Sequence, residues 1–139
     1  MRTKFGSRVV AGLALTFVVA AAIPVFAHHS FSAQYDRSKP ITLVGPVTKV
    51  DWINPHARFF IDAKDASGKV ANWEVELAAP AMLMRRGWTK NSLKVGAVVT
   101  VNASLAKDGS KLANASTVTL STGEKVFAGS SGGDDSPTP

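Results

Sequence analysis

The chain has 139 residues, of which 45% are hydrophobic, with 16 lysines and arginines, 10 aspartates and glutamates, and no cysteine. This length allows one small domain, and the lack of cysteine excludes a disulfide framework, a thiolate metal site and a thiol nucleophile. Three basic and no acidic residues precede residue 28, so the remainder carries a formal charge of +3, too modest to favour nucleic-acid binding.

The first 27 residues have the pattern of an export signal. A basic start is followed by an apolar run from residue 9 to 23, and Val25 and Ala27 occupy the small-residue positions that signal peptidase recognises. We therefore predict a signal peptide at 1–27, cleaved after Ala27, and a periplasmic or secreted protein. The apolar run approaches the length of a membrane span, so a retained membrane anchor is the alternative.

Two histidines would then begin the processed chain. His28 offers its α-amine and a ring nitrogen, His29 adds a second imidazole, and His56 follows a proline in a predicted turn. Residues 28–39 are predicted to form an extended arm, which at about 30 Å could reach His56. Imidazole is a common ligand for copper, zinc and nickel, and an open set of nitrogens suits copper(II) better than structural zinc. In the alternative, His56 merely caps its turn.

Beyond the arm, apolar residues recur mainly with a period of two, which is typical of strands. Strands are predicted at 41–52, 57–62, 72–77, 95–103, 112–120 and 125–127. The first of them is interrupted by Gly45-Pro46, where proline lacks a ladder donor and a bend or bulge is expected.

A short helix is predicted between the third and fourth strands. Pro80 suits a first helical turn, and Met82 and Leu83 are expected to plug one end of a barrel. This order predicts a mainly β fold, a small five-stranded OB-like Greek-key barrel with one short helix. A β-sandwich is the alternative, but about five strands are too few for it. The barrel domain is predicted at 40–127, with a disordered tail at 128–139.

OB barrels usually bind ligands on the outer face of strands two and three. In this chain that face is predicted to present Arg58, Phe60, Glu74 and Glu76. The two glutamates lie about 7 Å apart along one strand face, where they could hold a cation or serve acid–base chemistry. A solvated sheet surface is the alternative interpretation of the same four residues.

Several short motifs follow one another along the chain, namely His28-His29-Ser30-Phe31, Tyr35-Asp36, Asn54-Pro55-His56, Trp73-x-x-Glu76 and Arg86-Gly87-Trp88. Their order resembles a family of small exported bacterial proteins of unknown function, over roughly residues 28–120. This family often has an acidic residue directly after the glycine that opens the fourth predicted strand, whereas this chain has Ala97 at that position. The resemblance implies export and a single domain, and it implies no activity. Its recurring histidines imply that His28, His29 and His56 should be tested.

Three functions remain open from the sequence. The first is a periplasmic binding protein that holds copper or another divalent metal through His28, His29 and His56. The second is a metal-free envelope module that binds a peptide, glycan or protein partner on the barrel face. The third is a copper-dependent redox enzyme, since the N-terminal histidine arrangement resembles the copper brace of polysaccharide oxygenases and of some non-catalytic copper carriers. Binding is favoured over catalysis because no large substrate platform is evident.

Overall fold

The computed structural model describes residues 31–65 and 67–129. Its elements in chain order are α2 (Phe31–Gln34), β1 (Tyr35–Asp51), β2 (Arg58–Lys64), β3 (Val70–Glu76), α3 (Pro80–Arg85), β4 (Val98–Ala106), β5 (Leu112–Thr119) and β6 (Lys125–Phe127). The predicted signal segment 1–27, His28 and His29, and the tail from residue 130 lie outside the described residues.

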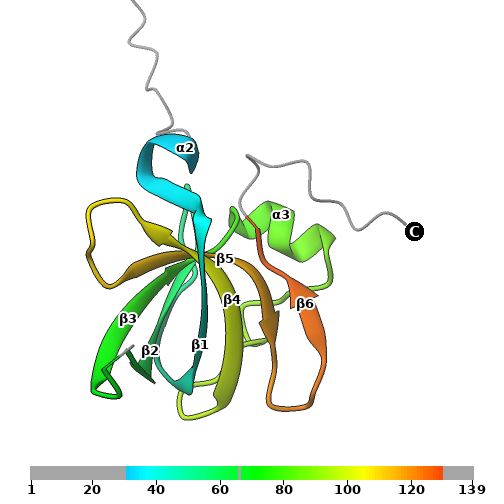
Figure 1. The fold of residues 1–139 in the computed structure, drawn as a ribbon. Coiled ribbons are helices and arrows are strands. Elements are labelled where there is room, and N and C mark those ends of the chain that lie inside the picture. The colour runs from blue at the N-terminus through cyan, green and yellow to red at the C-terminus, as the bar shows by residue number, and fades with distance from the viewer. Residues whose placement is uncertain (1–30, 66, 130–139) are drawn as a thin grey trace, which may run out of the picture.

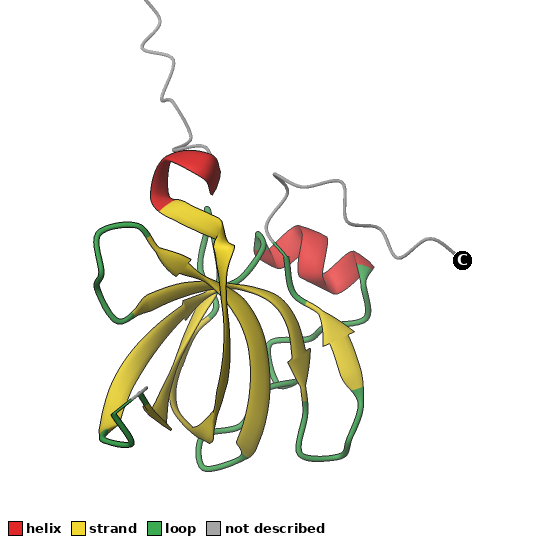
Figure 2. Cartoon of the chain, viewed as in Figure 1, coloured by secondary structure: helices red, strands yellow, loops and turns green. Residues whose placement is uncertain are grey.

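The strands form one curled sheet in the order β3-β2-β1-β4-β5-β6, as Figure 1 shows. A parallel pairing of β3 with β5 closes the first five strands into a ring, and β6 extends the sheet beyond β5. Strands dominate the described part of the chain, with short helices at the periphery (Figure 2). The prediction of a mainly β, OB-like barrel with a short helix between strands three and four is confirmed.

The long first strand serves two neighbours. Its earlier part pairs with β4 up to Pro46, and its last part pairs with β2 from Val47 onward. The register shift that accompanies this change lies between Val47 and Lys49, just after the Gly45-Pro46 step where the sequence predicts an interruption. The strand also begins at Tyr35, earlier than the predicted residue 41, because Tyr35 and Asp36 pair with the end of β4.

Alternation along the strands directs the apolar side chains into one core. Phe59, Ile61, Val75 and Val101 are fully buried. The helix α3 covers one end of the barrel with Leu83 fully buried and Met82 packed partly against the core, as predicted. The same core excludes water from the inner faces of the strands, which leaves only their outer faces and the loops to bind a ligand.

The three tryptophans pack into or against the core. Trp73 and Trp88 are buried, and Trp52 packs against the core while staying partly exposed. The indole Nε1 of Trp88 donates a hydrogen bond to the Phe127 carbonyl at 2.9 Å, and so links the segment after α3 to β6.

The segment predicted as an extended arm is described only from Phe31. Phe31–Gln34 form a single helical turn, and Tyr35 already belongs to the sheet. The buried Tyr35 side chain accounts for this early entry, since burial of an aromatic ring offsets the cost of ordering the strand. Within the part of the chain that the structure covers, no helix has the length and hydrophobicity to cross a membrane.

Candidate functional site

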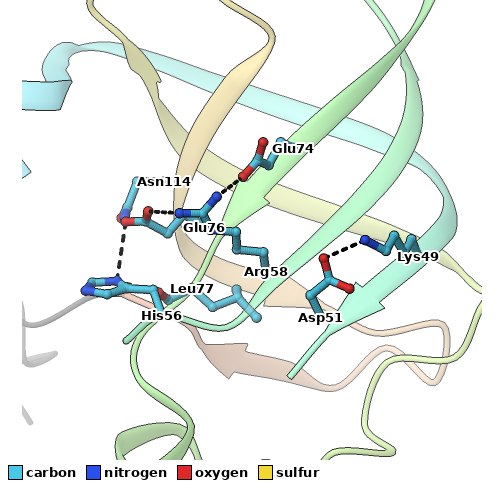
Figure 3. A network of polar contacts seen from close by, with 8 residues as sticks. All are labelled: Lys49, Asp51, His56, Arg58, Glu74, Glu76, Leu77 and Asn114. Carbon is cyan, nitrogen blue, oxygen red and sulfur yellow. Dashed lines mark hydrogen bonds and ion pairs between the residues drawn. The ribbon is translucent and has the colours of Figure 1, made fainter. Parts of the chain in front are cut away.

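A group of polar side chains gathers where β2, β3 and β5 run side by side. In the register of these strands, Arg58 lies opposite Glu76 on β2 and β3, and Glu76 lies beside Asn114 on β5. Figure 3 shows these side chains together with Glu74 and with His56 from the loop between β1 and β2. We call the set the Glu76 cluster, and its members are Tyr35, His56, Arg58, Glu74, Glu76 and Asn114.

His56 is held in one orientation by the end of β3. Its ring Nδ1 lies 3.0 Å from the carbonyl oxygen of Leu77 and 3.3 Å from Oε1 of Glu76. A carbonyl oxygen can only accept, so Nδ1 donates, and in the neutral ring the lone pair then resides on Nε2. Figure 3 shows this second nitrogen turned away from Glu76, and about 30% of the side chain is exposed.

The loop that carries His56 is itself anchored to the backbone after β3. The amide of Leu77 donates to the Ala57 carbonyl at 2.8 Å, and the amide of Ala57 donates to the Ala78 carbonyl at 3.1 Å. These two backbone hydrogen bonds fix the segment next to His56, so the backbone that carries the imidazole has a defined position.

Glu76 is buried although it lies on the outer face of the barrel. Only 8% of the residue is exposed. Its Oε1 accepts a hydrogen bond from Nδ2 of Asn114 at 3.1 Å, and its Oε2 lies 3.8 Å from a guanidinium nitrogen of Arg58. Arg58 makes its closer ion pair with Glu74, which is more exposed. A buried carboxylate is costly unless it is hydrogen-bonded or paired, and these contacts meet that requirement.

Tyr35 completes the cluster from the first residue of β1. The residue is 2% exposed, and its hydroxyl has no hydrogen-bond partner among the residues that the structure describes. Burial raises the pKa of Tyr35 above its usual range, and the negative charge of nearby Glu76 raises it further. The phenol therefore stays protonated and neutral at physiological pH.

The formal charges of the Glu76 cluster do not cancel. Two carboxylates, Glu74 and Glu76, face a single guanidinium, that of Arg58, and the protonated Tyr35 adds no charge. An imidazole binds a metal ion in its neutral form, so a metal-binding His56 would add none either. The remaining negative charge is partly shielded from water, because Glu76 is buried. An arrangement of this kind favours a cation at its edge, where Nε2 of His56 is the ring nitrogen that points away from Glu76.

The structure brings together most of the residues that the sequence singled out. His56, Arg58, Glu74 and Glu76 join one contact network. Phe60 lies on the same outer face, but its ring packs under the Lys49 ammonium group, 5.1 Å from the ring centroid, rather than on Glu76. His28 and His29 lie outside the described residues, and among the residues that are described no group of three His, Cys, Asp or Glu could hold a metal ion.

Tyr35 and Asn114 were missed as site residues. Tyr35 lies within one of the sequence motifs, but nothing local indicated that its ring would reach Glu76. Asn114 lies between two alanines that face the core. Its polar side chain in this strand is the signal that could have identified it as a site residue.

Comparison with protein families identifies the chain. The model of a family described as "Family of unknown function (DUF6152)" matches residues 14–115, the larger part of the sequence. No curated protein and no solved structure matches the chain. The match agrees with the resemblance to a family without an established activity. This small OB-like barrel protein therefore belongs to the DUF6152 family of unknown function.

Proposed function

We propose that the protein is exported and binds a late first-row divalent metal ion, with copper(II) foremost, through His56 together with His28 and His29. The observation that carries this proposal is the orientation of His56. Its Nδ1 contacts a backbone carbonyl and a carboxylate, which leaves Nε2 as the ring nitrogen that can bind a metal ion. Metal-bound histidines in proteins commonly donate their other ring nitrogen to such partners.

The chain geometry supports a contribution from the N-terminal histidines. The ring of Phe31 packs 5.4 Å from the ring of Tyr35, which itself interacts with Glu76. His29 and His28 precede Phe31 by two and three residues in the sequence. The segment that bears both histidines therefore joins the barrel beside the cluster that contains His56.

The chemistry of these ligands selects the metal. If export cleaves after Ala27, His28 offers an amine and an imidazole nitrogen, and His56 adds a further ring. Nitrogen-rich sites bind copper(II) most tightly among the divalent first-row ions, and the charge of the Glu76 cluster offsets that of the ion. The open coordination positions would take water or a small ligand.

The alternative, a partner bound on the face of Arg58, Phe60, Glu74 and Glu76, has less support. The charges of that face are engaged with one another, since Arg58 pairs with Glu74 and Glu76 is buried. A protein or glycan would have to displace these contacts before it could use them.

Metal titration of the exported, processed protein tests the proposal. Its N-terminus is determined by intact mass, and copper(II) binding is measured by competition with a chelator of known affinity. We expect one ion per chain and at least a tenfold weaker affinity in His28→Ala and in His56→Ala. The control Lys49→Ala, which alters the outer face away from His56, should bind as the wild type does.

Two results would overturn this ligand set. One is an N-terminus other than His28, which removes the amine from the site. The other is copper uptake no greater than that of a variant in which His28, His29 and His56 are all alanine.

A further inference from the structure

The buried polar residues of the described part are confined to one place. Glu76 and Asn114 are the only charged or polar residues that are buried there, and they are hydrogen-bonded to each other. Both lie on the outer face of their strands, where a side chain could otherwise reach water. A carboxylate is tolerated at such a position only with hydrogen-bonding or charged partners, so the partners of Glu76 indicate what its burial achieves.

An ion pair does little to explain why Glu76 is buried. The guanidinium of Arg58 lies 3.8 Å from the Glu76 carboxylate and makes its closer contact with Glu74. Closer to the Glu76 oxygens lie the Asn114 amide, at 3.1 Å, and Nδ1 of His56, at 3.3 Å. The carboxylate is thus fixed by Asn114 in a position from which it contacts the imidazole.

We infer that Glu76 is a positioning residue that prepares His56 to bind a divalent metal ion. The hydrogen bond of Nδ1 goes to the Leu77 carbonyl, and the buried Glu76 carboxylate lies 3.3 Å from the same nitrogen, where its negative charge strengthens the binding of a cation at Nε2. The same charge also offsets part of the charge of an ion at Nε2. This inference rests on the proposed function and adds that the site selects cations through Glu76.

The backbone alone does not account for this arrangement. The Leu77 carbonyl, 3.0 Å from Nδ1, is sufficient to select the tautomer of the neutral ring. It carries no net charge, however, and therefore does little to strengthen the bond between Nε2 and a cation. The contribution expected of Glu76 is electrostatic, and it can be separated from that of the carbonyl by removal of the charge with the shape retained.

The substitution Glu76→Gln removes that charge at nearly constant volume. We expect the affinity for copper(II) to fall about 10- to 100-fold, as is typical when the partner of a metal-bound histidine is changed. The electron paramagnetic resonance spectrum of the remaining copper complex should also differ from that of the wild type. Circular dichroism and thermal unfolding establish that the variant is folded.

The matched control is Glu74→Gln. It removes the same charge from the same cluster, but Glu74 contacts Arg58 rather than His56. We expect its affinity for copper(II) to change less than threefold and its spectrum to match that of the wild type. Equal losses of copper(II) affinity in the two variants would mean that Glu76 acts only through the total charge of the cluster, and this result would overturn the inference.

The tautomer of His56 in the wild-type protein provides a test that needs no substitution of Glu76. Nitrogen-15 NMR of the metal-free protein, with His56→Gln to assign the signals, should show the proton of the neutral ring on Nδ1. A proton on Nε2 would overturn the inference even if Glu76→Gln failed to fold. Wild-type protein that takes up no copper refutes the proposed function, whereas tight binding that is unchanged in Glu76→Gln refutes only the role of Glu76.

Discussion

Gly45 illustrates how a single residue can set the shape of the barrel. It lies in β1 next to the point where this strand passes from its partner β4 to its partner β2. A Cβ atom built on Gly45 would lie 1.9 Å from the Asp62 carbonyl oxygen, well inside van der Waals contact. The backbone of β2 thus approaches β1 more closely at this residue than any side chain would permit.

We therefore predict that Gly45→Ala destabilises the protein by about 1–3 kcal/mol or more, because the obstructing atoms belong to the backbone and cannot rotate away. Urea unfolding monitored by tryptophan fluorescence measures the change. The control Val44→Ala alters an exposed residue of the same strand and should cost less than about 1 kcal/mol. Equal stability of Gly45→Ala and the wild type would show that the two strands do not approach so closely.

The orientation of His56 is decided by contacts that no neighbour in sequence supplies. The turn around Pro55 indicated only that the histidine would lie in a loop. Its two partners come from the end of β3, 20 and 21 residues further along the chain. A sequence pattern cannot specify the ring nitrogen that such partners engage.

Alternation along β2 is the feature that the sequence predicted best. Phe59 and Phe60 are adjacent and identical in type, yet Phe59 is fully buried in the core whereas Phe60 lies on the outer face beside Lys49. Successive side chains of a strand point to opposite faces, so this difference follows from the local period once the strand is assigned.

The two phenylalanines form a matched pair for measurement. We predict that Phe59→Ala lowers the free energy of unfolding by about 3–5 kcal/mol, because it leaves a cavity in the core. Phe60→Ala removes only a surface contact and should cost about 1 kcal/mol or less. Chemical denaturation of both variants gives the comparison, and a larger effect for Phe60→Ala would mean that the strand faces are reversed.

The same alternation misleads at Glu76. The period places Glu74 and Glu76 together on the outer face, and both residues do lie there, but only Glu74 remains in contact with solvent to a substantial degree. Glu76 is buried and accepts a hydrogen bond from Asn114, a residue of β5 that is 38 positions further along the chain. Local periodicity determines which way a side chain points and not what covers it.

Three aspartates respond to acid in the same way, namely Asp36 near the start of β1, Asp65 in the loop between β2 and β3, and Asp108 in the loop between β4 and β5. Asp36, Asp65 and Asp108 each accept hydrogen bonds from the side chain and backbone of a serine two residues later. The serine hydroxyls hold the pKa of each carboxyl below its usual range, with the backbone amides adding to the effect. A pKa that is lower in the folded state than in the unfolded state makes folding depend on pH.

The sign of that dependence is fixed. The unfolded chain binds protons at the ordinary aspartate pKa of about 3.9, so the stability contributed by these hydrogen-bonded carboxylates is present above that pH. It is lost as the pH falls through the lower values of the folded protein. A variant with Ser38, Ser67 and Ser110 changed to alanine should lose less stability on acidification than the wild type. Urea unfolding at a series of pH values measures this, and identical slopes would contradict the assignment.

The sequence by itself determined the class of fold, the approximate strands, the helix between strands three and four and a set of residues on the outer face. It did so because the alternation of apolar residues and the positions of proline and glycine act over a few residues. Only the tertiary structure decided that β1 begins at Tyr35, that Glu76 is buried and that Nδ1 of His56 contacts Leu77 and Glu76. Each of these features depends on contacts between strands that are far apart in the chain, and such contacts exist only after the barrel has closed.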